Sequence, residues 1–152
     1  MTALIQRFQR LRKEEKGITL VELLAVIVII GVIAAIAVPL ITGILNDTKT
    51  NARSATANQL YEAARLRSIA KNNGEITGTH KLSDLVTDKY IQSGLTDPKT
   101  GRDLVAADTT INLSNLSTAN AVIVTLEVTG GETITFNATQ LKNSQAGTSD
   151  TP

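Results

Sequence analysis

The sequence predicts an α+β protein in which one long N-terminal α-helix packs on a small antiparallel sheet. Three features support this fold class. Residues 23–45 form an uncharged apolar run, residues 46–72 contain neither Pro nor Gly, and two segments near the C-terminus alternate apolar with polar residues. We therefore expect a helix from about Thr19 to Asn72, with its first half in a membrane and its second half in the head.

The chain is expected to fall into four parts. These are a leader at residues 1–17, a transmembrane helix at 18–45, a globular head at 46–142 that includes the second half of the helix, and a flexible tail at 143–152. The tail has no apolar residue other than Ala146, so it has little surface to bury.

Charge is distributed unevenly between the leader and the rest of the chain. Residues 1–17 contain five basic and two acidic residues, a net charge of +3, whereas the remainder carries ten basic and twelve acidic residues, a net charge of −2. Basic residues beside an apolar helix stay on the cytoplasmic side. We therefore expect the N-terminus inside and the bulk of the chain outside, and the mildly acidic remainder argues against nucleic acid as a partner.

The apolar run at residues 23–45 is long enough to cross a membrane. Its 23 residues span about 34 Å as a helix, compared with about 30 Å for the hydrocarbon core of a bilayer. Gly31, Pro39 and Gly43 interrupt the run, and we expect them to give the helix local flexibility.

Two ordinary interpretations of this run remain open. It could be an uncleaved signal anchor, or a secretory signal peptide cut after Ala37, because Ala35-Ile36-Ala37 has the small-x-small pattern of a cleavage site. The second interpretation predicts a soluble secreted binding domain. Neither explains Glu22, a carboxylate just inside the apolar helix, where an ionised group costs on the order of a few kcal/mol.

The stretch at residues 46–72 is expected to continue the helix into the head. Small or apolar residues recur there at spacings of three and four, which predicts the face that packs on the sheet. This predicted face consists of Thr48, Ala52, Ala55, Gln59, Ala63, Leu66 and Ala70, widened by Leu60 and Ile69. The basic residues Arg53, Arg65, Arg67 and Lys71 are expected mostly off this face, in salt bridges between subunits or in solvent.

The alternating segments at residues 122–128 and 133–138 predict a β-hairpin. Because side chains alternate between the two faces of a strand, loop length decides which residues share a face. A three-residue loop, Thr129-Gly130-Gly131, brings both apolar sets to one face. It pairs Val124 with Phe136, Leu126 with Ile134 and Val128 with Glu132. A short helix at 83–91, a turn at 97–101 and a brief strand at 111–113 complete the predicted head.

The composition offers little from which to build an active site. No cysteine is present, which excludes disulfides and thiolate metal sites. The single histidine, His80, lies in a polar stretch that we expect to be a solvated loop. Asp97, Asp103 and Asp108 lack the spacing of an EF-hand loop and are expected to be turn and surface residues. We therefore expect no enzyme activity, catalytic residue, metal or cofactor.

The junction of leader and helix, Lys16-Gly17-Ile18-Thr19-Leu20-Val21-Glu22, resembles the N-terminus of type IV prepilins. The related type II secretion pseudopilins and competence pilins share this pattern. The resemblance implies that a prepilin peptidase cuts after Gly17 and that the new N-terminus, Ile18, is N-methylated. Glu22 would become the fifth residue of the mature chain, where the family carries its signature Glu. Many members have Phe where this chain has Ile18.

The resemblance implies a structural subunit with a pilin-like fold. Its partners would be copies of itself in a filament, the peptidase and methyltransferase, and an assembly platform with its ATPase. The subunit would wait in the cytoplasmic membrane and then move to an extracellular pilus that serves adhesion, motility or DNA uptake. Glu22 would guide docking by pairing with the amine of Ile18, because the two charges neutralise each other in a dry environment. A pseudopilin of a secretion or competence system is the alternative within the family.

Overall fold

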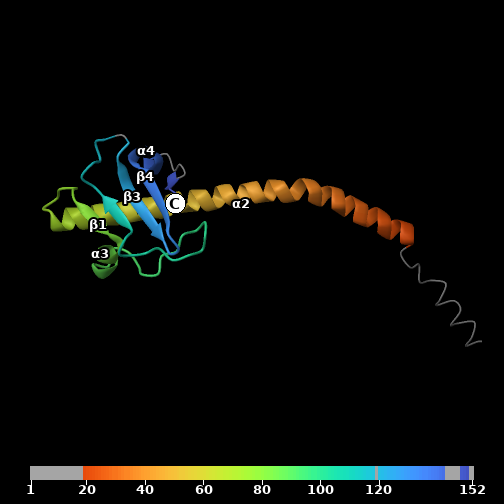
Figure 1. Ribbon diagram of the computed structural model, residues 1–152, viewed down its shortest axis with the longest axis horizontal. Coiled ribbons are helices and arrows are strands. Elements are labelled where there is room, and N and C mark those ends of the chain that lie inside the picture. The colour runs from red at the N-terminus through yellow and green to blue at the C-terminus, as the bar shows by residue number, and fades with distance from the viewer. Residues whose placement is uncertain (1–18, 119, 143–147, 151–152) are drawn as a thin grey trace, which may run out of the picture. The chain divides into compact units, whose positions relative to one another are not determined.

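The computed structural model describes residues 19–118, 120–142 and 148–150. The expected leader, with Gly17 and Ile18, lies outside the described residues. Contacts divide the chain into two units, residues 1–43 and 44–152, and helix α2 (Leu20–Lys71) has residues in both (Figure 1). The expectation of one helix from about Thr19 to Asn72 is confirmed to within one residue at each end.

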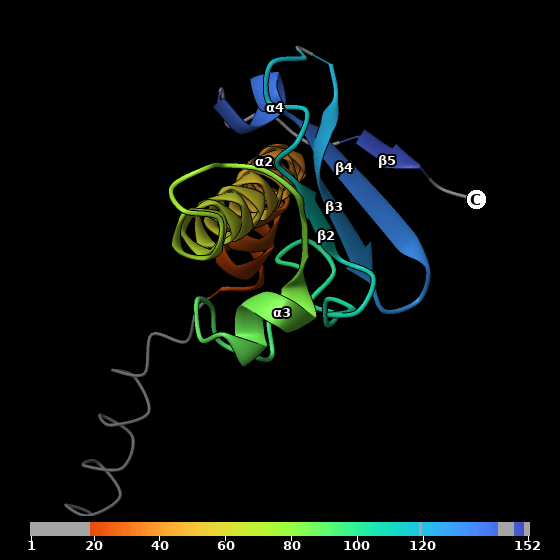
Figure 2. The ribbon, with the colours of Figure 1, turned by 90° about the vertical axis from the view of Figure 1, so that its left-hand side faces the viewer.

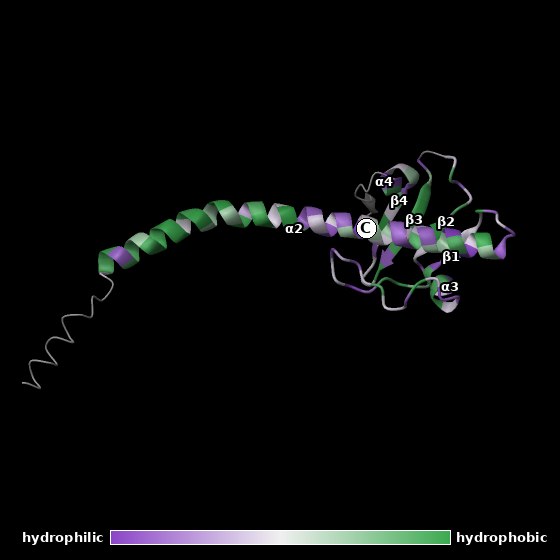
Figure 3. Cartoon of the chain, turned by 180° about the vertical axis from the view of Figure 1, so that it is seen from behind, coloured by the Kyte–Doolittle hydropathy of each residue, from purple (hydrophilic) through white to green (hydrophobic). Residues whose placement is uncertain are grey.

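The first unit consists of the apolar part of α2. Every residue from Leu20 to Gly43 except Ala37 is exposed, and the large apolar side chains have half or more of their surface accessible. Figure 3 shows this part of the helix as hydrophobic, interrupted by few polar residues. Among the described residues, α2 is the helix long and apolar enough to cross a membrane.

The second unit contains a five-stranded antiparallel sheet with strands in sequence order, β1 to β5. The strands are β1 (Thr79–Lys81), β2 (Thr110–Asn112), β3 (Val122–Val128), β4 (Glu132–Asn137) and β5 (Thr148–Asp150). Figure 2 shows the head part of α2 beside one face of the sheet, with α3 (Leu82–Thr87) and α4 (Ala138–Lys142) toward opposite ends. The α+β fold class predicted from the sequence is confirmed.

The core lies between the head part of α2 and the sheet. It includes Leu60 and Ala64 from the helix and Val124, Leu126 and Phe136 from the hairpin, each 0% exposed. Burying these side chains excludes water from both elements at once, which is the main contribution to the stability of the head.

The predicted packing face of α2 is largely wrong. The buried face consists of Arg53, Ser54, Ala57, Leu60, Ala63, Ala64 and Ser68, whereas Leu66 is 57% and Ile69 38% exposed. Only Leu60 and Ala63 belong to both sets. The predicted face was chosen from the spacing of small and apolar residues. Such spacing does not indicate that an arginine and two serines are buried through polar partners.

The predicted hairpin register is confirmed. Val128 pairs with Glu132, Leu126 with Ile134 and Val124 with Phe136, and the connection is the three residues Thr129-Gly130-Gly131. The alternation fails only at the start of β3, where Val122 is 44% exposed and Ile123 is 1% exposed. The pairing is irregular between Val122 and Val124, which shifts the side-chain alternation by one position.

The C-terminal segment differs from the expected flexible tail. Thr148–Asp150 form β5, whose backbone pairs with Thr133, Ile134 and Thr135 of β4. A strand held by backbone hydrogen bonds needs no apolar residue, which is why composition did not indicate it. The rest of the expected tail lies outside the described residues.

Candidate functional site

The first turn of α2 is closed by Thr19 and Glu22. The Thr19 backbone N–H and hydroxyl both donate to Glu22 Oε2, at 2.8 and 2.9 Å, and the Glu22 backbone N–H donates to Thr19 Oγ1 at 3.2 Å. This reciprocal arrangement is a capping box, which satisfies backbone donors that the first turn leaves free. Ser or Thr followed three residues later by Glu is a sequence signal for such a box.

Glu22 is the single charged residue from Leu20 to Leu45. Its carboxylate has about four lone-pair positions, and Thr19 fills two of them on Oε2. The side chain can therefore keep its cap and still accept hydrogen bonds from a cation. A carboxylate at the start of the otherwise uncharged apolar part of α2 can thus accept hydrogen bonds from a positive group.

The residues expected to make the helix flexible have different surroundings. A Cβ placed on Gly31 or Gly43 would meet no other atom within 4 Å, so neither glycine is required by packing within the described chain. Pro39 lies inside α2 and lacks the N–H that would reach the carbonyl of Ala35. Thr42 Oγ1 donates to the carbonyl of Val38 at 2.9 Å, in the turn after the proline.

Comparison with known proteins identifies the N-terminal segment. Residues 12–38 match the prokaryotic N-terminal methylation motif. The chain carries the type IV prepilin signature. The matched segment includes the capping box and most of the exposed apolar helix. No curated protein and no solved structure matches the chain.

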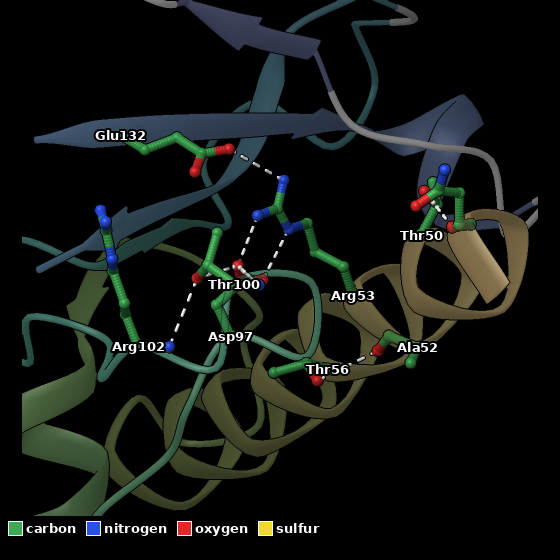
Figure 4. A network of polar contacts seen from close by, with 9 residues as sticks. Thr50, Ala52, Arg53, Thr56, Asp97, Thr100, Arg102 and Glu132 are labelled. Atoms are coloured by element: carbon green, nitrogen blue, oxygen red, sulfur yellow. Dashed lines mark hydrogen bonds and ion pairs between the residues drawn. The ribbon is translucent and has the colours of Figure 1, made fainter. Parts of the chain in front are cut away.

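The head contains a buried ion cluster that was not predicted from the sequence. Arg53, on α2, donates through Nε to Asp97 Oδ1 at 2.6 Å and through Nη2 to Asp97 Oδ2, and its Nη1 contacts Glu132 Oε1 at 3.1 Å (Figure 4). Arg53 is 4% exposed and Asp97 0% exposed. Asp97 was expected to be a turn or surface residue. It does occupy the predicted turn, but its side chain points into the core.

The electrostatics of this cluster favour an ionised Asp97. Burial raises the pKa of Asp97, but hydrogen bonds from Arg53 and Thr100 outweigh burial and lower it to about 2. The two Thr100 bonds come from its backbone N–H, at 3.0 Å, and its hydroxyl, at 2.7 Å. Both charges are therefore present at neutral pH, and each is satisfied by the other.

A second cluster surrounds Arg67, farther along α2. Arg67 Nε donates to Asp88 at 2.6 Å, and Lys71 also pairs with Asp88. Arg67 Nη1 lies 2.8 Å from His80 Nδ1, and since a guanidinium can only donate, Nδ1 accepts and Nε2 donates to the Thr77 carbonyl at 3.2 Å. The expectation that His80 lies in a solvated loop is wrong, because it is 5% exposed.

These contacts also revise the expectation for the basic residues of α2. Arg53, Arg65, Arg67 and Lys71 all pair with carboxylates of their own chain, although the Arg65–Glu62 pair is long, at 3.5 Å, and exposed. Within the described residues no group of three or more His, Asp or Glu side chains could hold a metal ion.

Proposed function

We propose that this chain is the precursor of a structural subunit of a type IV pilus. A peptidase would cut after Gly17, Ile18 would be N-methylated, and the apolar helix would leave the membrane to pack among like helices in a filament. The proposal rests chiefly on the helix residues 20–43, an almost entirely exposed apolar surface, most of which lies within the methylation motif. Such a surface has to be covered by lipid or by other copies of the chain.

Glu22 is proposed to set the register of assembly. Cleavage after Gly17 creates an α-amine at Ile18, four positions before Glu22. A cation and a carboxylate that are each costly in a dry environment become compatible as a hydrogen-bonded pair. The pair could form within one chain or between neighbours, and in the second case an incoming subunit would be held at one position along the helix.

The test is filament incorporation of Glu22 variants, measured as protein sheared from cells and sedimented. Glu22→Ala and Glu22→Gln should leave expression and membrane insertion unchanged and lower sedimentable protein by at least about tenfold, the equivalent of 1.4 kcal/mol. Glu62→Ala, which removes an exposed carboxylate from the head part of the same helix, is the matched control. Normal filaments from Glu22→Ala would overturn the docking role.

The same assay separates a pilus from a pseudopilus. Long filaments that shear from the cell surface support the pilus subunit. Processed protein that stays with the cell, together with a defect in protein secretion or DNA uptake when it is deleted, would favour a pseudopilin of a secretion or competence system.

A further inference from the structure

Arg53, Asp97 and Glu132, here called the Arg53 clasp, lie where α2 enters the packed part of the head. No described residue from Thr19 to Ala52 is buried. Arg53 is the first buried residue of the helix, followed by Ser54 and then Ala57. Counting from the N-terminus, the clasp therefore includes the first buried side chain of α2.

The clasp joins three segments that are far apart in the sequence. Asp97 is 44 positions from Arg53, and Glu132, at the start of β4, is 79 positions away. The loop that carries Asp97 is closed by a hydrogen bond from the Asp97 N–H to the Arg102 carbonyl, and Leu104, just after it, bridges to Val128 of β3. A displacement of Arg53 is thus passed to the loop and to both strands of the hairpin.

We propose that the Arg53 clasp is the contact through which tension along α2 enters the head. This inference rests on the proposed function, since a filament held together by residues 18–45 transmits pulling force through α2 to each head. A bidentate pair between buried charges suits this task. Its hydrogen bonds are short and directional, and a small displacement leaves an unpaired charge away from water.

Arg67 provides a matched control on the same helix. It lies 14 positions after Arg53, binds Asp88 at 2.6 Å and is 15% exposed. Tension that enters from the N-terminal end of α2 reaches Arg53 first. Tension that enters from the other end of the helix reaches Arg67 first.

The test is single-molecule pulling of the full-length protein in lipid nanodiscs. The chain has no cysteine, so handles can be attached at Asn51→Cys and Ser117→Cys, both exposed positions. In this geometry Arg53→Lys should raise the unfolding rate at constant force by about tenfold or more, and Arg67→Lys by less than about threefold. With handles at Glu75→Cys and Ser117→Cys, Arg53→Lys should lose its larger effect.

Two outcomes contradict the proposal. If Arg53→Lys and Arg67→Lys accelerate unfolding equally in both geometries, or if each effect matches only the variant's loss of equilibrium stability, the clasp is not the point of force entry. Glu132→Gln keeps the Arg53–Asp97 pair and serves as a milder variant if Arg53→Lys does not fold. It should give a smaller change with the same dependence on geometry. The measurement requires no filament, so it succeeds or fails separately from the assembly assay.

Discussion

Arg53 and Asp97 form two hydrogen bonds between side chains that are both buried, although they lie 44 positions apart in the sequence. The pair connects the helix to a loop that has little apolar surface of its own. In a head without disulfides, such a connection fixes a segment that hydrophobic burial alone would hold weakly.

Replacing Asp97 by Asn should destabilise the head by about 3–5 kcal/mol, because it removes the buried counter-ion of Arg53 and leaves only the partly exposed Glu132 to balance that charge. The measurement is urea unfolding of the full-length protein in detergent, followed by the fluorescence of Tyr61 and Tyr90. Asp108→Asn, at an exposed position, should change the free energy of unfolding little. Equal effects of the two substitutions would contradict the role of the pair.

Stability should also depend on pH through Asp97. Its pKa in the folded state, about 2, lies below the ordinary value of 3.8. A lowered pKa stabilises the fold at every pH above the ordinary value, and that stabilisation is lost as the pH falls from about 4 to 2. The amount lost is about 2 kcal/mol. Unfolding curves between pH 5 and 2 test this, and Asp97→Asn should flatten the dependence. An equally steep loss in that variant would assign the effect to other carboxylates.

Ser68→Ala should destabilise the loop that follows α2 by about 1–3 kcal/mol. The Ser68 hydroxyl is 0% exposed, lies 3.0 and 2.9 Å from the carbonyl oxygens of Glu75 and Thr77, and accepts the Thr77 N–H at 2.9 Å. Hydrogen exchange of the Thr77 amide should speed up in the variant. The exposed Ser93→Ala is the control, and unchanged protection of Thr77 in Ser68→Ala would show that the hydroxyl does not hold the loop.

The two glycines of the hairpin loop should differ in their tolerance of a side chain. Gly130 has φ +110 and an added Cβ would lie 2.7 Å from Arg102 Nη1, whereas Gly131 has φ +87 and nothing near an added Cβ. Both substitutions by Ala strain the backbone, by roughly 1–2 kcal/mol. Gly130→Ala should cost more because Arg102 must also move. Thermal unfolding of the two variants decides the order, and a larger loss for Gly131→Ala would contradict it.

Gly31→Ala tests whether the apolar helix needs flexibility. An added methyl meets no atom in the described chain, and Ala favours a helix by about 1 kcal/mol relative to Gly. We expect normal membrane insertion and head stability but a lower filament yield by shearing and sedimentation. Adding Ala34→Gly should restore the yield if flexibility is the requirement. A normal yield from Gly31→Ala alone would remove Gly31 from the account.

The parts of the fold that depend on residues close in the sequence were predicted from residue spacing and from loop length. The long helix and the hairpin register followed from an uninterrupted stretch and from one loop length, and the structure confirms both. The packing face of α2 did not follow, because Arg53 is buried through carboxylates 44 and 79 positions away and Ser68 through backbone groups of the loop that follows the helix. Arginine and serine are polar, so a prediction from hydropathy places them on the surface. The strands β1 and β5 are only three residues long and polar, so their pairing depends on neighbouring strands and leaves no local pattern.

Some parts of the candidate site could likewise be predicted from the sequence, and others could not. The position of Glu22 and the exposed apolar helix could be predicted because they depend on sequence order alone. The capping bonds between Thr19 and Glu22 were also within reach of a sequence rule, since Thr and Glu stand three positions apart. The Arg53 and Arg67 clusters needed the tertiary structure, because each joins segments that no motif connects.

The intact mass and N-terminal sequence of the protein from its native host test the central claim most directly. Processing as a prepilin predicts a chain that begins at N-methylated Ile18. A chain that begins at Val38 would instead show a secreted domain released by signal peptidase, and a chain found only with Met1 would show an uncleaved membrane anchor. Either of these results would contradict the account of Glu22 and of filament assembly.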